Sequence, residues 1–184
     1  MNSPSTSPGR DLRCIPCVER HHEAVRAIFN EAIVNSTALY DLHPRDEAFM
    51  RQWWQAKREG NWPVLGLENE QGELLGFATY GPFRPHAAYQ FTVEHSLYIE
   101  VSQRGAGLGR RLLSALIEDA RQRGFHNMIG VIDASNEASL RLHHRLGFSP
   151  CGSIREAGRK FDRWLDLQLV QRLLEPASTG GAAM

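Results

Sequence analysis

The pattern of hydrophobic and polar positions predicts a strand followed by a helix between residues 97 and 124. Leu97, Ile99 and Val101 alternate with more polar neighbours, which is the period of a half-buried strand. From residue 108 the apolar positions recur at helical spacing, and Gly124 follows as a stop signal. The apolar positions of this helix are Leu108, Leu112, Leu113, Leu116, Ile117 and Ala120. The segment therefore predicts a strand that runs directly into an amphipathic helix.

The remaining periodicities predict elements on both sides of this unit. Before it they predict a strand at 12–18, helices at 24–35 and 45–59, a hairpin of 64–68 with 74–80, and a strand that resumes near Tyr89 and continues through 91–101. After it they predict a strand at 128–133, a helix at 136–146, and closing strands at 149–155 and 164–173 that turn at Ala157 and Gly158. This order predicts an α/β fold with a mixed central sheet flanked by helices.

Composition limits the kind of protein. A chain of 184 residues with 42% hydrophobic content is long enough for one well-packed domain, which we place at 11–175. The flanking segments 1–10 and 176–184 are rich in small residues and proline, and we expect them to be disordered. Basic and acidic residues number 21 each, so charge gives no reason to expect nucleic acid or a membrane as partner. No apolar run approaches the ~20 residues of a membrane span, and we expect a cytoplasmic protein with a small-molecule substrate.

Three cysteines do not suggest a disulfide framework. Cys14 and Cys17 have the spacing of half a metal site, with His21 and His22 nearby, but no second pair exists and Cys151 stands alone. We therefore expect buried structural thiols and no metal.

A glycine-rich turn at 104–111 separates the central strand from its helix. Glycine lets the backbone turn tightly and lets a ligand approach the N–H groups, and the unpaired amides of a helix start form a phosphate site. The dinucleotide fingerprint needs a third glycine where Arg110 stands, and the P-loop needs a Gly-Lys pair that is absent. The turn therefore favours another kind of pyrophosphate ligand, although glycine can also serve turn geometry alone.

The pattern Arg104-x-x-Gly107-x-Gly109 resembles the acyl-CoA signature of the GNAT N-acetyltransferases. The element order resembles the whole GNAT fold over about 12–174. Within that superfamily, four segments are similar to phosphinothricin acetyltransferases, and more closely to the bacterial branch that acetylates methionine sulfoximine and methionine sulfone. These segments are 81–84, 91–98, 136–148 and 158–166.

The resemblance implies acetyl-CoA as cofactor. Backbone amides of the turn would hold its pyrophosphate, Arg104 and Arg110 would add charge, and the central strand would supply an oxyanion donor. Asn136 would bind the pantetheine arm, although it can also be a plain helix N-cap. The implied cofactor-binding residues are Leu97, Tyr98, Ile99, Arg104, Gly107, Leu108, Gly109, Arg110, Arg111, Asn136 and Ser139.

The resemblance also implies two catalytic residues. Glu94 matches the general base that would take a proton from the acceptor amine, or alternatively a carboxylate that pairs with an arginine or orients the amine. His143 stands where most GNAT enzymes have a tyrosine, and it could act as general acid or as a second base. Its neighbour His144 points about 100° away on the helix and is expected to face solvent.

For the acceptor, Arg84 is the candidate to bind a carboxylate, because a guanidinium recognises one through two parallel hydrogen bonds. Phe83, Tyr89 and Tyr40 would wall an amino-acid-sized pocket, and Lys160 and Trp164 match a family segment near the site and a dimer contact. The implied function is acetylation of the α-amine of a small amino-acid analogue by a homodimer. Alternatives are a GNAT enzyme acting on protein N-termini or polyamines, and a non-catalytic acyl-CoA sensor.

Overall fold

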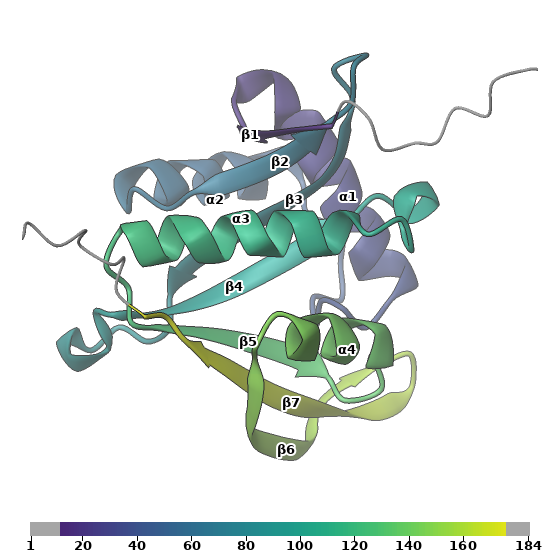
Figure 1. Ribbon diagram of the computed structural model, residues 1–184. Coiled ribbons are helices and arrows are strands. Elements are labelled where there is room, and N and C mark those ends of the chain that lie inside the picture. Colours follow the sequence, from purple (N-terminus) through teal and green to yellow (C-terminus); the bar gives the residue numbers. More distant parts are fainter. Residues whose placement is uncertain (1–11, 176–184) are drawn as a thin grey trace, which may run out of the picture.

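A seven-stranded mixed sheet runs through the computed structural model, which describes residues 12–175 (Figure 1). The strand order is β1-β2-β3-β4-β5-β7-β6. All neighbours are antiparallel except β4 and β5, which are parallel. The strands are β1 (Arg13–Pro16), β2 (Val64–Glu68), β3 (Leu74–Pro82), β4 (Thr92–Ile99), β5 (Asn127–Asp133), β6 (Ser149–Lys160) and β7 (Arg163–Leu173). The expected mixed α/β fold is confirmed, while the expectation of disorder at 1–10 and 176–184 falls outside the described residues.

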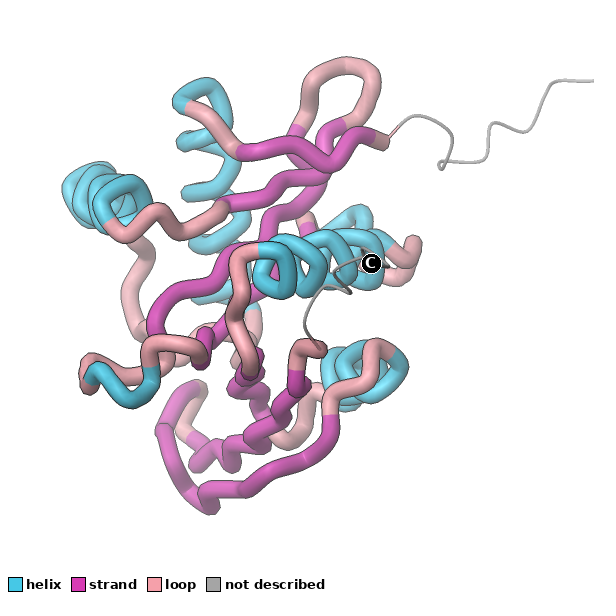
Figure 2. Tube along the Cα trace, turned by 60° about the vertical axis from the view of Figure 1, so that its left-hand side comes forward, coloured by secondary structure: helices cyan, strands magenta, loops and turns pink. Residues whose placement is uncertain are grey.

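Helices cover both faces of this sheet. They are α1 (His22–Asn35), α2 (Glu47–Glu59), α3 (Leu108–Gln122) and α4 (Glu137–Arg145), with short 3-10 turns η1 (Glu19–His21), η2 (Ala87–Tyr89) and η3 (Val101–Gln103). Figures 1 and 2 show α1 and α2 on one face and α3 and α4 on the other. Successive strand residues point to opposite faces, so β3 sends Phe77 into the aromatic core under α1 and α2 and sends Ala78 and Tyr80 into the core under α3.

The α3 stripe predicted from periodicity is the buried one. Leu112, Leu113, Leu116 and Ala120 are fully buried on the side of α3 that packs on β2, β3 and β4, and Leu108 and Ile117 are nearly so. On the opposite face, Trp54 is buried in the aromatic core while the adjacent Trp53 is half-buried at its margin. This placement follows from the 100° turn between consecutive helical residues.

Three predicted boundaries are wrong. Tyr89 belongs to the turn η2 rather than to a strand, and β4 ends at Ile99, so Val101 lies in η3. β6 continues to Lys160, and the chain turns at Phe161 and Asp162, which both have positive φ. Gly158 lies inside β6, where a Cβ would come within 2.7 Å of the Tyr40 ring, so this glycine serves packing rather than a turn.

The parallel pairing of β4 and β5 is short, and this creates the site. Only Thr92–His95 of β4 pairs with Asn127–Gly130 of β5. Beyond His95 and Gly130 the two strands separate, as Figure 1 shows. Backbone groups of residues 96–99 that point away from β3 therefore have no strand partner, and N–H groups of this kind are strong hydrogen-bond donors.

Candidate active site

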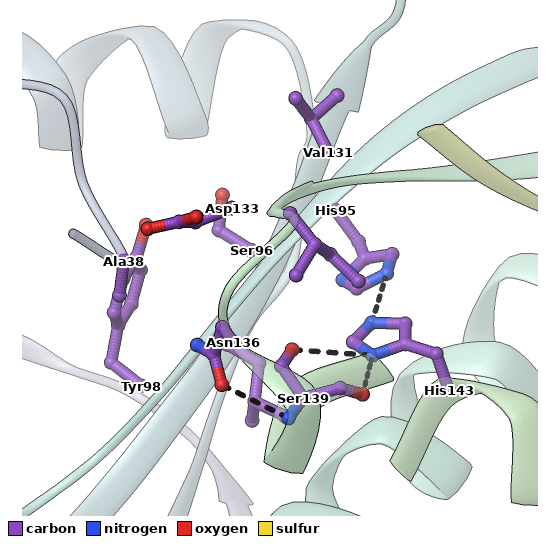
Figure 3. A pocket seen from close by; sticks show the side chains of 11 residues that line it. Ala38, His95, Ser96, Tyr98, Val131, Asp133, Asn136, Ser139 and His143 are labelled. Atoms are coloured by element: carbon purple, nitrogen blue, oxygen red, sulfur yellow. Dashed lines mark hydrogen bonds between the residues drawn. The ribbon is translucent and has the colours of Figure 1, made fainter. Parts of the chain in front are cut away.

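A cavity of about 90 Å³ occupies the point where β4 and β5 separate. Its wall comes from β4, from the end of β5, from α4 and from the loop after α1. The lining residues are Ala38, His95, Ser96, Leu97, Tyr98, Val131, Ile132, Asp133, Asn136, Ser139 and His143 (Figure 3). Five of the predicted functional residues therefore share one cavity: Leu97, Tyr98, Asn136, Ser139 and His143.

The start of α3 has the geometry of an anion site. Gly107 precedes the helix with φ 81°, a left-handed conformation that side chains rarely adopt, and it has no side chain to cap the helix. The amides of Leu108, Gly109 and Arg110 therefore have no partner within the helix and carry its positive dipole end. Gly109 has a packing role as well, since a Cβ there would lie 3.1 Å from Leu142 of α4.

Two of the three arginines near this turn have partners within the described residues. Arg104 forms an ion pair with Glu31 of α1, and its Nε donates to the Ile99 carbonyl at 3.2 Å. Arg111 donates to the Leu12 carbonyl. Arg110 is exposed and makes no hydrogen bond or ion pair with any residue in the described range 12–175. Arg110 is thus the side chain most available to an anion at this turn.

Asn136 caps the N-terminus of α4, as the alternative interpretation of this residue predicts. Its side-chain oxygen accepts from the Ser139 amide at 3.1 Å, so it is an N-cap. The cap uses only the oxygen, and the amide nitrogen remains a donor at the cavity wall (Figure 3). Both interpretations of Asn136 are therefore compatible with the structure.

His143 is buried in the wall, and hydrogen bonds engage both of its ring nitrogens. Nδ1 lies 2.7 Å from the Ser139 carbonyl oxygen, and Nε2 lies 3.1 Å from Nε2 of His95. Burial lowers the pKa of His143, an effect that the Ser139 hydrogen bond partly opposes. His144 is exposed, as predicted. A role for His143 as proton donor or acceptor would require one of these hydrogen bonds to break.

Glu94 and Arg84 meet at the other end of β4. The antiparallel register places Gly81 opposite Glu94, so the loop that follows β3 brings Arg84 back over the strand. The guanidinium lies 3.8 Å from the carboxylate, with side chains 54% and 36% exposed. Burial raises the pKa of Glu94, and the charge of Arg84 opposes this only in part. The site thus holds a carboxylate with raised basicity beside a guanidinium that water still reaches.

The predicted aromatic wall is only partly assembled. The Phe83 and Tyr89 rings meet edge to face at 5.7 Å, and the Arg84 guanidinium lies 4.3 Å above Phe83. Lys160, which was also predicted to bind the substrate, donates to the Leu39 carbonyl at 2.7 Å and connects β6 to the loop after α1. Phe83, Tyr89 and Arg84 therefore form one cluster, and Arg84 links it to Glu94.

Tyr40 and Trp164 lie elsewhere. Tyr40 packs against Gly158 of β6. Trp164 is 60% exposed and lines a second depression together with Asp133, Arg163 and Asp166.

Sequence reasoning missed two titratable residues of the cavity, His95 and Asp133. Asp133 is buried at the end of β5, and its Oδ1 accepts from the Ser135 amide and hydroxyl at 2.8 and 2.9 Å. Burial pushes the pKa of Asp133 up, but hydrogen bonds from Thr37 and Ser135 hold it below its usual value. An acidic residue directly after the apolar run 128–132 was the available signal. For His95 the available signal was a histidine that continues the alternating series of the apolar residues Leu97 and Ile99.

The cysteines lie outside the cavity. Cys14 on β1 and Cys151 on β6 are exposed, so the expectation of buried thiols is wrong for both, because each lies on an edge strand of the sheet. Cys17 is half-buried, and burial raises its pKa to about 12.

None of the helices within residues 12–175 has the length and the apolar content that a membrane span requires.

Comparison with known proteins identifies the fold and its chemistry. The Acetyltransferase (GNAT) family model matches residues 25–148. The chain is 45% identical over 152 residues to the L-methionine sulfoximine/L-methionine sulfone acetyltransferase of Pseudomonas paraeruginosa, covering 83% of this chain and 88% of that protein. It is 36% identical over 157 residues to the phosphinothricin N-acetyltransferase of Alcaligenes faecalis, covering 85% of this chain and 79% of that protein.

A solved structure gives the same answer for the fold. A GNAT superfamily phosphinothricin acetyltransferase from Sinorhizobium meliloti, in complex with acetyl-CoA, superposes with a TM-score of 0.86 at 31% identity, covering 92% of this chain and 95% of that one. The chain therefore belongs to the GNAT family and is an N-acetyltransferase that uses acetyl-CoA.

Proposed function

We propose that the protein transfers the acetyl group of acetyl-CoA to the α-amine of a small amino-acid analogue of the methionine sulfoximine, methionine sulfone or phosphinothricin kind. The relatives named above carry these substrates in their names. The observation that carries the proposal here is the pair formed by Arg84, in the loop after β3, and Glu94, near the start of β4, which are 3.8 Å apart.

The pair matches the charges of an α-amino acid. An amino acid carries its carboxylate and its ammonium on the same carbon, so a recognising site needs a cation and an anion close together. Arg84 offers the cation, with donors that suit a carboxylate, and Glu94 offers the anion. A polyamine carries only positive charge, and a site for it would need carboxylates where Arg84 stands.

Acetyl-CoA fits the gap where β4 and β5 separate. Its pyrophosphate would lie on the free amides of Leu108, Gly109 and Arg110 at the start of α3. The pantetheine arm would follow the gap between β4 and β5, within reach of the Asn136 amide. The thioester carbonyl would then face the unpaired backbone of residues 97–99, where an N–H group can stabilise the oxyanion of the tetrahedral intermediate.

Direct transfer follows from this arrangement. Glu94 accepts a proton from the ammonium, directly or through one water, and the freed nitrogen lone pair attacks the thioester carbon. The C–N bond forms, the tetrahedral intermediate collapses, and the C–S bond breaks to release CoA as the thiolate, while the nitrogen loses its second proton to water. His143 has both ring nitrogens in hydrogen bonds, so we assign proton removal from the amine to Glu94 alone.

A thiol-release assay over a panel of acceptors tests this function. Purified protein and acetyl-CoA are mixed with methionine sulfone, methionine sulfoximine, phosphinothricin, spermidine or a peptide with a free N-terminus, and free CoA is measured. We expect turnover with the three amino-acid analogues and none above background with spermidine. Faster turnover of the peptide or spermidine would contradict the proposal, and cofactor binding without any turnover would favour a sensor.

We also propose that the protein is a homodimer in the cytoplasm. The β6–β7 hairpin forms the edge of the sheet and exposes Ile154, Phe161 and Trp164 by half or more, and apolar side chains gathered on one edge are typical of an interface. Light scattering should give twice the mass of one chain, and Trp164→Glu should give a monomer; a wild-type monomer would contradict the dimer. The cytoplasmic location is supported by the cofactor, because the phosphate charges of acetyl-CoA keep it from crossing membranes.

A further inference from the structure

Two imidazoles meet at the point where β4 and β5 separate. His95 is the last residue of β4 that pairs with β5, opposite Gly130, and His143 reaches it from α4. Their Nε2 atoms are 3.1 Å apart, and the ring planes differ by 18° (Figure 3). The residues are 7% and 2% exposed. The hydrogen bond between them is therefore well shielded from water.

The surroundings fix which nitrogen carries each proton. The Ser139 carbonyl can only accept, so the His143 Nδ1 that lies 2.7 Å away carries a hydrogen. A neutral imidazole has one N–H, which leaves Nε2 of His143 as an acceptor. The proton between the two rings therefore belongs to Nε2 of His95. Nδ1 of His95 is then unprotonated, and it is buried without a hydrogen-bond partner among the described residues.

On the side away from the cavity, two groups pack closely against the pair. A Cβ on Gly130 would lie 3.0 Å from Nε2 of His95 and 3.4 Å from the His143 ring. The Phe148 ring stands edge-on to both imidazoles, at 5.5 and 5.1 Å. A glycine on β5 and an aromatic ring after α4 thus hold the pair in place.

Electrostatics keeps both rings uncharged at neutral pH. Burial lowers the pKa of His95 to about 3, with a contribution from His143, and burial lowers the pKa of His143 as well. The other titratable groups lining this cavity are Tyr98 from β4 and Asp133 from β5, and Tyr80 of β3 stands opposite His95 in register. Hydrogen bonds already engage the Asp133 Oδ1, and no carboxylate forms an ion pair with either imidazole within residues 12–175.

We propose that His95 is a positioning residue for the acetyl transfer: by donating its Nε2–H it holds a neutral, Nδ1-protonated His143 at the head of the thioester cleft. The proposal rests on the proposed function. The hydrogen bond between the two imidazoles then holds α4 against β4 at the point where β4 and β5 separate. In this assignment neither imidazole donates a proton to the leaving group, and CoA departs as the thiolate.

Nuclear magnetic resonance of the full chain tests the assignment without any turnover. With ¹⁵N-labelled histidine, we expect His143 as the Nδ1–H tautomer and His95 as the Nε2–H tautomer. His95 should stay neutral near pH 7, and His143 should titrate below the pKa of an ordinary histidine. An Nε2–H tautomer of His143, or a pKa of either ring at or above the ordinary value, would overturn the proposal. This result is read independently of whether any amino acid is acetylated, so it separates failure of the inference from failure of the proposed function.

A matched pair of variants tests the positioning role. His95→Leu fills the space but removes the donor, and we expect kcat to fall about 5- to 100-fold, as for loss of one buried hydrogen bond, with a smaller change in the KM of the acceptor. His95→Gln offers an amide donor at a similar reach and should recover most of the lost kcat. If His95→Leu does not fold, the tautomer measurement and the kcat of His95→Gln still show whether His95 positions His143. Wild-type kcat in the Leu variant, or an equal loss in the Gln variant, would refute the role.

Discussion

Replacing Glu94 with glutamine is expected to lower kcat by about 10²- to 10⁴-fold, the usual contribution of a positioned general base. Glutamine keeps the shape and a hydrogen-bonding oxygen but cannot accept the ammonium proton. Because Glu94 is not among the residues that line the cavity, the affinity for acetyl-CoA should change little. Steady-state rates measured by thiol release, with acetyl-CoA binding measured by calorimetry, give both quantities.

The matched control is Glu47→Gln, an exposed carboxylate on α2 that is 3.9 Å from Arg51. It should leave kcat unchanged. A Glu94→Gln enzyme as active as the control would remove Glu94 as the base.

The pH dependence of kcat/KM gives a second measure of the same residue. The protonated form of Glu94 cannot accept a proton, so activity should rise with pH through the pKa of Glu94 and then level off. Burial raises that pKa, so the acidic limb should lie above the range of an ordinary glutamate. An acidic limb at or below that range, or none at all, would contradict the assignment.

Arg84→Ala is expected to raise the KM for carboxylated acceptors by about 10- to 100-fold, as for loss of a charge-assisted hydrogen bond pair, with a smaller effect on kcat. The exposed guanidinium donates to the Phe83 carbonyl at 2.8 Å and lies 3.8 Å from Glu94, so its remaining N–H groups can bind a ligand carboxylate. An acceptor in which a methyl group replaces the carboxylate should bind both proteins equally poorly. Arg84→Lys keeps the charge but loses the forked geometry, so its KM should fall between the two.

The same substitution carries an independent signature. Arg84 partly offsets the effect of burial on Glu94, so its removal should shift the acidic limb of the pH profile to still higher pH. A KM that does not change and a limb that does not move would together exclude contact of Arg84 with either the acceptor or the base.

Much of the fold could be predicted because local pattern and tertiary packing agree. The apolar stripe of α3 is the stripe that the sheet buries, and the mixed sheet follows from the order of elements. The β6–β7 hairpin was predicted wrongly because Gly158 is a stronger turn signal than Phe161 and Asp162. Gly158 instead leaves space for the ring of Tyr40, which lies in the loop after α1. This contact joins residues far apart in the sequence, so no local pattern predicts it.

The site could be predicted only in part, for the same reason. The glycine-rich turn at 104–111 can be recognised from its local sequence, whereas Glu94 and His143 were assigned by resemblance to a family. The closeness of Arg84 to Glu94 depends on the register between β3 and β4, which sequence spacing does not fix. His95 was missed because its role exists only through His143, 48 residues away.

A crystal structure of the protein with CoA and methionine sulfone would show both ligands together, because this pair cannot react and both stay in place. We expect the pyrophosphate on the amides at the start of α3 and the CoA sulfur between β4 and β5. The α-amine should lie within about 3–3.5 Å of Glu94 or of a water bound to it, with the carboxylate on Arg84. Methionine sulfone bound with its amine away from Glu94, or CoA bound outside the gap between the strands, would contradict this arrangement.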